Sequence, residues 1–242
     1  MTFILPSFGA SAISTVPGSG GGGGGFSNTY SVDFDGTDDV ITTTTAYATI
    51  WSASAWIKPN FTSGAYGTIF SDGSSRRAYI YYDGTNYTVY LRQGSSPFNI
   101  LTSSGNSIHD TWTHIAYTRD SSTSTAVLYI NGSQVDTATD GGDTANKAKP
   151  TNIGCINTSG TFAFNGKIDE FGWWDGTVLS SSDVTAIYNS GVPDDLSSYS
   201  PTHWWRMGDN DGGTGTTITD QGSGGNDGTL TNGPTFSSDV PT

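Results

Sequence analysis

One stretch, WTHIAYTRDSSTSTAVLYINGSQVD at residues 112–136, constrains the fold of this chain more than any other. It holds two runs with alternating positions and many β-branched or aromatic residues, Trp112–Thr118 and Thr125–Ile130, separated by a polar Asp-Ser-Ser-Thr-Ser segment. Such runs predict two β-strands joined by a turn. Asn131-Gly132 readily adopts positive φ, so Ser133–Asp136 is predicted to return as a third strand through a tight hairpin.

The second run is apolar on both faces. Ala126, Leu128 and Ile130 alternate with Val127 and Tyr129, so each side of the strand carries apolar side chains. A strand of this kind is covered on both sides, which predicts a layered structure. With 242 residues, seven Trp, twelve Tyr and eleven Phe, the chain can fill one large core, so we expect a single main domain.

Charge and composition exclude several classes of protein. The formal net charge is −13, and the nine Lys and Arg are scattered, so no nucleic-acid partner is expected. Cys155 is the only cysteine, which excludes an internal disulfide. No apolar run reaches the ~20 residues of a membrane span. The start, MTFILPSFGASA, has no basic residue before its apolar patch, so a signal peptide is not expected.

Further motifs extend the pattern on both sides of the central hairpins. They are FDGTDDV at Phe34–Val40, ASAWIKP at Ala53–Pro59, NIGC at Asn152–Cys155 and FNGKIDEFGWWDGTVLSSSDVTAIYNSG at Phe164–Gly191. Together these motifs resemble laminin-G-like domains, the concanavalin A-like jelly rolls of lectins and pentraxins, over about two thirds of the chain. The resemblance implies an all-β fold, a two-sheet antiparallel jelly-roll sandwich. It does not imply a function, because this fold carries sugar binding, protein binding, hydrolysis and architecture alike.

One short peripheral helix is expected beside the strands. Ser182–Asn189 has an apolar stripe, Ser180 and Asp183 approximate a capping box, and Gly191 follows as a C-terminal glycine. Strands besides the central ones are predicted at Tyr30–Val40, Ile50–Ile57, Thr68–Ser71, Ala78–Tyr82 and Thr88–Arg92.

The chain divides into an N-terminal arm (1–25), a jelly-roll domain (26–236) and a short tail (237–242). The C-terminal segment 194–236 contains HWWRMGD at His203–Asp209, which resembles the opening of such domains although it comes last here. This order suggests a circular permutation, which predicts that Trp204 and Trp205 pair beside Phe164–Trp173 in the same chain. Exchange of this segment between protomers is the alternative.

The arm combines a sparse apolar set with the six glycines Gly20–Gly25, which have great backbone freedom. It is either a disordered tail or an anchor that docks onto another protein, with the glycines as a tether. The residues that would form the anchor are Phe3, Ile4, Leu5, Phe8 and Ile13.

No enzymatic activity is expected. Glycosidases need two positioned carboxylic acids, and the glucanase relatives carry them in a Glu-x-Asp-x-x-Glu pattern. The matching stretch here is Lys167–Gly172, in which Asp169 and Glu170 are strand neighbours that alternation would turn to opposite faces. The three histidines lack both a nucleophile motif and zinc-ligand spacing.

Structural calcium is a candidate cofactor, because all but one of the 22 acidic residues are Asp, a turn residue and a hard oxygen ligand. The resemblance implies an ion near Asp169, and the C-terminal segment adds further carboxylates. Turn formation alone also explains this abundance of Asp. The candidate ligands are Asp169, Asp209, Asp211, Asp220 and Asp227.

Sugar binding would use exposed aromatic rings beside polar loops. The candidates are Tyr66, Tyr81, Tyr87 and Trp174. The first functional hypothesis is a non-enzymatic virion structural or decoration protein, displayed on the surface of a phage particle, bound to a viral capsid or another virion protein through its arm, and present as a homo-oligomer. The alternative is a carbohydrate-binding adhesin that recognises host or environmental glycans. A secreted matrix protein is a third, weaker option.

Overall fold

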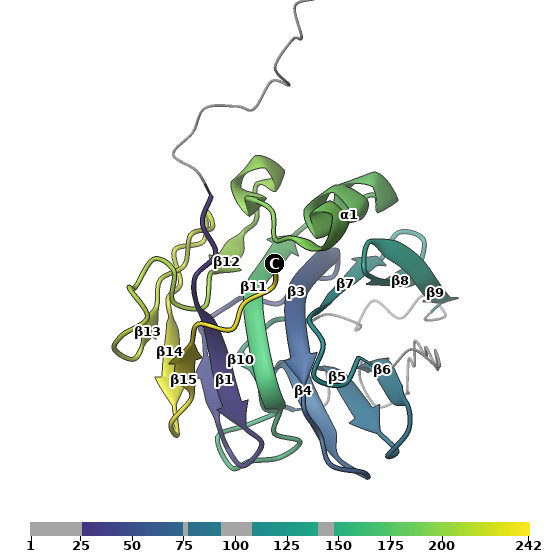
Figure 1. Ribbon diagram of the computed structural model, residues 1–242. Coiled ribbons are helices and arrows are strands. Elements are labelled where there is room, and N and C mark those ends of the chain that lie inside the picture. Colours follow the sequence, from purple (N-terminus) through teal and green to yellow (C-terminus); the bar gives the residue numbers. More distant parts are fainter. Residues whose placement is uncertain (1–25, 75–76, 93–107, 140–147) are drawn as a thin grey trace, which may run out of the picture.

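The computed structural model describes residues 26–74, 77–92, 108–139 and 148–242. Their strands form two antiparallel sheets that lie face to face (Figure 1). The sequence prediction of an all-β, concanavalin A-like jelly-roll sandwich is therefore confirmed. The predicted arm, residues 1–25, lies outside the described residues.

The first sheet has the strand order β15-β1-β11-β3-β7-β8-β9, and β12 also pairs with β11. Its strands are β1 (Ser31–Asp35), β3 (Trp51–Pro59), β7 (Thr113–Asp120), β8 (Thr125–Ile130), β9 (Ser133–Thr139), β11 (Asn165–Asp175), β12 (His203–Trp205) and β15 (Thr235–Ser237). The second sheet has the order β13-β14-β2-β10-β4-β5-β6. Its strands are β2 (Val40–Thr42), β4 (Tyr66–Ser71), β5 (Arg77–Tyr82), β6 (Tyr87–Arg92), β10 (Asn152–Ile153), β13 (Thr217–Ile218) and β14 (Gly228–Thr231).

The central hairpins form as predicted. Asn131 and Gly132 connect β8 to β9 with φ values of 49° and 73°, the left-handed pair that a two-residue hairpin turn requires. The two faces of β8 are both covered: Leu128 is buried in the core between the sheets, and Tyr129 is buried on the opposite side among residues of the helical layer. The strand is thus covered on both sides.

Helices cover the outer face of the first sheet. They are α1 (Ser181–Tyr188), η1 (Asn189–Gly191) and η2 (Leu196–Tyr199). The capping box is present, because the Ser180 hydroxyl accepts from Asp183 N and the Asp183 carboxylate accepts from Ser180 N. The helix begins at Ser181, one residue before the predicted start. None of the helices in the described ranges is long and apolar enough to cross a bilayer.

The core between the sheets is rich in aromatic residues. Trp51 from β3 stacks on Trp173 from β11 with ring centroids 5.0 Å apart. Phe70 from β4 meets both rings edge-on at 5.9 and 5.6 Å. Edge-on contacts between aromatic rings are favourable beyond their buried area, so this cluster joins the two sheets firmly.

The C-terminal segment completes the first sheet within the same chain. β12 pairs with β11 in the register Phe171 with Trp205 and Gly172 with Trp204. This is the pairing that a circular permutation predicts, and the structure needs no exchange between protomers to form it. The division of the chain into arm, domain and tail remains a prediction.

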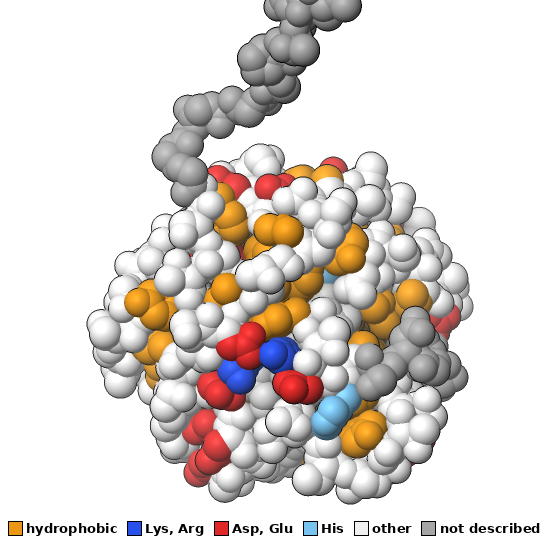
Figure 2. All heavy atoms as spheres, in the orientation of Figure 1, with side chains coloured by type: hydrophobic (Ala, Val, Ile, Leu, Met, Phe, Trp, Pro, Cys, Tyr) orange, Lys and Arg blue, Asp and Glu red, His pale blue; other side chains and the backbone are white. Residues whose placement is uncertain are grey.

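Residues 237–242, predicted as a tail, start with the last residue of β15 and run over the outer face of the first sheet. Asp239 accepts hydrogen bonds from Lys58 Nζ at 2.8 Å and Trp112 Nε1 at 3.0 Å. Lys167 Nζ lies 3.6 Å from the same carboxylate. Figure 2 shows this group as the cluster of acidic and basic side chains near the centre of the visible face.

Candidate carbohydrate-binding surface

Four tyrosines lie on the outer face of the second sheet. Tyr66 of β4 pairs with Tyr81 of β5, and Tyr79 of β5 pairs with Tyr90 of β6. The residues between them, such as Ile80 and Val89, point to the core, so period-two alternation turns the tyrosines outward. Phe162, from the segment between β10 and β11, lies against them. These five residues, Tyr66, Tyr79, Tyr81, Tyr90 and Phe162, are called the aromatic surface below.

The rings of the aromatic surface contact one another. Tyr66 lies 4.5 Å from Tyr81 and 4.8 Å from Phe162 between ring centroids. Tyr79 stacks on Tyr90 at 4.7 Å with only 6° between the ring planes. Tyr66 keeps 39% of its surface exposed, and the other four rings are partly exposed. Partly exposed rings fixed by their neighbours can receive the apolar face of a flat ligand at little entropic cost.

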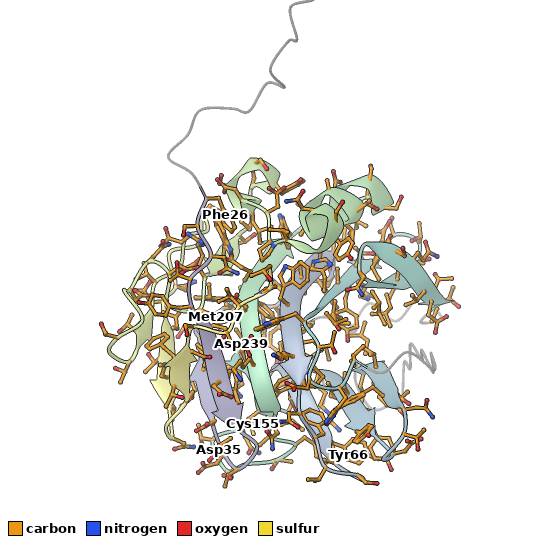
Figure 3. All side chains as sticks on the ribbon, viewed as in Figure 1. Phe26, Asp35, Tyr66, Cys155, Met207 and Asp239 are labelled. Atoms are coloured by element: carbon orange, nitrogen blue, oxygen red, sulfur yellow. The ribbon has the colours of Figure 1, made fainter. Side chains whose placement is uncertain are left out.

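A hollow of about 290 Å³ borders this surface. Its walls include Tyr66, Phe162, Thr62 and Asn165, so aromatic faces and hydrogen-bonding groups line the same space. Figure 3 shows Tyr66 at the same end of the sandwich as Asp35, with Phe26 at the opposite end. Aromatic rings beside a few polar groups are typical of ligand sites in proteins.

Two of the four predicted glycan-binding residues are not on this surface. Tyr87 is 2% exposed, and its hydroxyl contacts Phe61 N and His109 Nδ1 at 3.3 and 2.8 Å. Burial raises the pKa of Tyr87 to about 12. Trp174 is 1% exposed, because Leu196 and the helical layer cover it, and its Nε1 donates to Tyr199 O at 2.8 Å. Neither ring is accessible to a ligand in this structure.

The sequence reasoning selected Tyr66 and Tyr81 but left out the other three rings. Tyr79 and Tyr90 carried a usable signal, since they share the outward face with Tyr81 in the same period-two pattern. Phe162 carried none. It lies outside the strands with a φ of 53°, and only the folded chain brings it to Tyr66.

Two of the predicted calcium ligands come close together. Asp169 and Asp209 meet at the start of the domain, where Asn28 Nδ2 donates to Asp169 at 2.9 Å and Thr29 N to Asp209 at 2.8 Å. Burial and neighbouring carboxylates raise the pKa of Asp169 well above its ordinary value, and burial also raises that of Asp209.

Arg206 occupies the centre of this acidic group. It donates to Glu170 Oε1 at 3.1 Å and to Asp209 Oδ2 at 3.2 Å. The other carboxylate oxygens of Asp169 and Asp209 accept hydrogen bonds from the protein. Arg206 already supplies a positive charge to this cluster, so a calcium ion bound there would have to displace it.

The opposite orientation predicted for Asp169 and Glu170 is wrong. A β-bulge interrupts the pairing of β11 with β3 at this point, and Glu170 has a φ of 47°. The extra residue breaks the alternation, so the two carboxyls meet neighbouring segments of the chain: Asp169 accepts from Asn28, and Glu170 accepts from Arg206. Both acids are buried, at 0% and 2% exposed, beneath these contacts.

The remaining predicted ligands lie elsewhere and shape the C-terminal segment. Asp211 accepts from Thr219 N and Oγ1, and Asp227 accepts from Asp220 N. Asp220 binds His203 Nδ1 at 2.6 Å and three backbone N–H groups. The five predicted carboxylates therefore do not form one coordination sphere.

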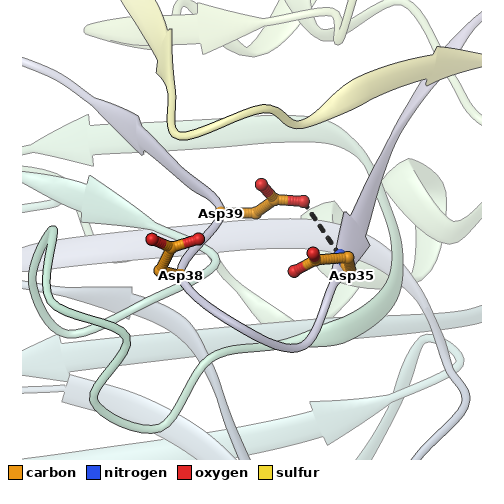
Figure 4. Close-up of side chains that lie close together, drawn as sticks. All are labelled: Asp35, Asp38 and Asp39. Atoms are coloured by element: carbon orange, nitrogen blue, oxygen red, sulfur yellow. Dashed lines mark hydrogen bonds between the residues drawn. The ribbon is translucent and has the colours of Figure 1, made fainter.

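A different acidic group was not predicted. Asp35, Asp38 and Asp39 place carboxylate oxygens within 4.8 Å of one another, and they are the one such trio in the described ranges (Figure 4). Asp39 accepts from Asp35 N and Asp35 accepts from Thr37 N, so two of the three fix their own turn. Burial and the neighbouring acids raise the pKa of Asp39.

Comparison with known protein families identifies the superfamily of this fold. The family model described as the concanavalin A-like lectin/glucanases superfamily matches residues 34–185. The chain belongs to this superfamily. Strands β12 to β15 lie beyond the matched range. A search of curated protein sequences finds no match.

Two solved structures illustrate the fold. One is a protein from Bacteroides ovatus described as carbohydrate-binding, with 20% identity and a TM-score of 0.66 over 89% of this chain. The chain spans 62% of the length of that protein. The other is a heptameric pentraxin from Limulus polyphemus, with 17% identity and a TM-score of 0.53 over 66% of this chain and 82% of that one. At these identities the likeness establishes the fold alone.

Proposed function

We propose that this chain is a non-catalytic carbohydrate-binding module that holds saccharides on the aromatic surface. The observation that carries the proposal is the exposed Tyr66 ring, which stacks on Phe162 and packs against Tyr81 beside a hollow with aromatic and polar walls. Pyranose rings present apolar faces that stack on aromatic side chains, while their hydroxyls need hydrogen-bonding partners. Both requirements are met at this place.

The superfamily supports the proposal, because its description names lectins as well as glucanases. The Bacteroides ovatus protein adds a carbohydrate-binding relative of the same fold. The burial of Asp169 and Glu170 beneath Arg206 and Asn28 supports the non-catalytic part, because a glycosidase must bring two carboxylic acids to its substrate.

The test is a glycan-binding panel with the full-length protein, followed by titration of the saccharides that bind. We expect Tyr66→Ala and Tyr81→Ala each to weaken binding about fivefold to a hundredfold, the range for a lost stacking contact of ~1–3 kcal/mol. Phe26→Ala, an aromatic substitution at the opposite end of the sandwich, is the matched control and should bind as the parent does. Absence of binding to every saccharide would reject the proposal.

A second proposal concerns display on a phage virion, as a decoration protein in several copies with residues 1–25 as its anchor. Its support is the position of Phe26, which follows the arm and stacks on Trp204 at 6.4 Å, with Arg206 4.5 Å from its ring. This attachment lies at the end opposite to Tyr66 (Figure 3), so an anchored domain would present the aromatic surface outward.

Co-sedimentation with emptied virus particles tests display. Binding by the full chain and not by residues 26–242 supports the anchor, and equal or absent binding of both forms rejects it. A structural calcium ion also remains a proposal, taken from the sequence. Titration of metal-stripped protein with calcium, with the melting temperature as a second readout, tests it, and no heat together with no shift rejects it.

A further inference from the structure

Two arginines stand side by side at the border of the aromatic surface. Arg77 of β5 and Arg92 of β6 are direct cross-strand partners, so their side chains share one face of the sheet. They lie in line with Tyr79 and Tyr90, two positions along the same strands. Arg77 places its guanidinium 5.1 Å from the Tyr79 ring centroid and 5.0 Å from that of Phe162.

This pair is unusual in a chain whose formal net charge is −13. Lys58, Lys167 and Arg206 each form ion pairs with carboxylates. Neither Arg77 nor Arg92 has a carboxylate ion-pair partner in the part of the chain that the structure describes. Like charges directly opposite one another in a sheet are destabilising, so a negatively charged ligand between the two arginines would relieve their repulsion.

The hydrogen-bonding groups of the two arginines are also incompletely used. Arg77 Nη1 donates to Ser74 O at 3.2 Å, but the Nε atoms of Arg77 and Arg92 are both buried and find no acceptor. Asp72 is the carboxylate among the described residues whose charge acts on Arg77, and it already accepts from Tyr47 and Ser74. Burial and the neighbouring Arg92 lower the pKa of Arg77, as expected for a cation without a counter-ion.

An anion fits the guanidinium ends of this pair, because both side chains are partly exposed although their Nε atoms are buried. The terminal N–H groups of an arginine lie in one plane, as a fork, and match the two oxygens of a carboxylate. The aromatic surface next to the fork matches a sugar ring. From Tyr81 to Arg77 the strand covers about 13 Å, at ~3.3 Å per residue, which leaves room for more than one sugar unit.

We propose that the aromatic surface binds an acidic saccharide whose sugar ring stacks on the tyrosines and whose carboxylate is held by Arg77 and Arg92. This inference rests on the proposed carbohydrate-binding function and narrows its ligand to carboxylated sugars, such as uronic or sialic acids. The carboxylate supplies the counter-charge that the described part of the chain does not provide at this place.

The test compares a carboxylated ligand with its uncharged ester and with a ligand that carries a different anion. Full-length protein is titrated with an oligogalacturonate, with the methyl ester of the same oligosaccharide, and with a sulfated oligosaccharide that has no carboxylate. We expect the free acid to bind about tenfold or more tightly than the ester, the range for a charged hydrogen bond. The preference should weaken as salt is raised.

Variants assign the effect to the two arginines. Arg92→Gln and Arg77→Gln should each lose the preference for the acid, and Arg92→Lys should restore it only in part, because lysine keeps the charge without the fork. Lys167→Gln removes one positive charge from the other sheet and should behave as the parent. Arg77 packs on two rings, so Arg77→Gln could lower the melting temperature of the protein. In that case Arg92→Gln, on edge strand β6, is the variant that tests the proposal.

The outcomes separate the two proposals. Equal binding of acid and ester, or an unchanged preference in Arg92→Gln, overturns the acidic ligand and leaves carbohydrate binding intact. Tighter binding of the sulfated oligosaccharide than of the carboxylated one overturns the assignment to a carboxylate. If the parent protein binds no saccharide of any kind, both proposals fail.

Discussion

Tyr66 and Phe162 stack with their ring centroids 4.8 Å apart and their planes 17° from parallel. One residue opens strand β4 and the other lies in the segment between β10 and β11, so the contact joins parts of the chain that are distant in sequence. The segment is also tied to β4 through the hydrogen bond from Thr68 N to Phe162 O at 2.9 Å. Phe162 therefore supports the ring that we propose as the main contact for a sugar.

The Tyr66–Phe162 stack should appear as a coupling free energy in a double-mutant cycle. We expect Tyr66→Ala and Phe162→Ala to destabilise the fold by less together than the sum of their separate effects, with a difference of about 0.5–1.5 kcal/mol for a stacked pair. Urea unfolding of the four proteins measures it. The pair Tyr66→Ala and Phe26→Ala, at opposite ends of the sandwich, should be additive. If the effects of Tyr66→Ala and Phe162→Ala are additive, the two rings do not stabilise each other and the stack is contradicted.

Removal of the Tyr87 hydroxyl should affect stability but not sugar binding. Tyr87→Phe deprives the buried N–H of Phe61 of its acceptor, so we expect a loss of about 1–3 kcal/mol in the free energy of unfolding. Tyr90→Phe is the control, because its hydroxyl has no hydrogen bond among the described residues. A loss of saccharide affinity in Tyr87→Phe would mean that this ring reaches the ligand after all.

The buried acids around Arg206 predict an unusual dependence of stability on pH. Burial raises the pKa of Glu170 to about 7, even though Arg206 and Trp204 lower it. Between the ordinary pKa of a glutamic acid and pH 7, the folded chain keeps a proton that the unfolded chain has lost. The stabilisation from Glu170 should therefore be lost as pH rises from about 5 to 8, by on the order of 1.4 kcal/mol per unit of pKa difference. The raised pKa of Asp169 acts in the same direction. His114 acts in the opposite direction below its ordinary pKa, because burial lowers its pKa to about 3.

Thermal unfolding with a chelator present measures this effect without interference from metal ions. Glu170→Gln should lose less stability than the parent between pH 5 and 8, since it removes one of the titrating groups. Asp220 and Asp239 have lowered pKa values, so they titrate at more acidic pH and do not contribute in this window. The same change of melting temperature between pH 5 and 8 in the parent and in Glu170→Gln would contradict the assignment.

Much of the fold could be read from local pattern. The alternation in Thr125–Ile130 gave the bounds of β8, Asn131-Gly132 gave the hairpin turn, and Ser180 with Asp183 gave the capping box of α1. Each of these signals depends on residues that are close in sequence. The resemblance to laminin-G-like domains supplied the pairing of β12 with β11, which no local pattern specifies.

The candidate site could be predicted only in part. Alternation predicts that Tyr81 points to the outer face of its sheet, but it does not predict whether that face is covered. Trp174 also points outward, and it is buried because η2 and α1 pack over it. The bulge at Glu170 has no signature in a stretch that otherwise reads as a regular strand. The vacant donors of Arg77 and Arg92 depend on what surrounds them in space, which the sequence does not state.

Asp239, in the last segment of the chain, should stabilise the domain through its charge. It binds Lys58 at 2.8 Å and lies 3.6 Å from Lys167, but its side chain is 39% exposed, so solvent screens the pairs. We expect Asp239→Asn to lower the free energy of unfolding by about 0.2–1 kcal/mol per pair lost, and by less at high salt.

Asp33→Asn loses only the contact with Lys167 at 3.4 Å and is the matched control. Urea unfolding at low and high salt measures both variants. Equal effects of the two substitutions, or an effect of Asp239→Asn that salt does not reduce, would show that the segment is held by its backbone and by Trp112 rather than by the lysines.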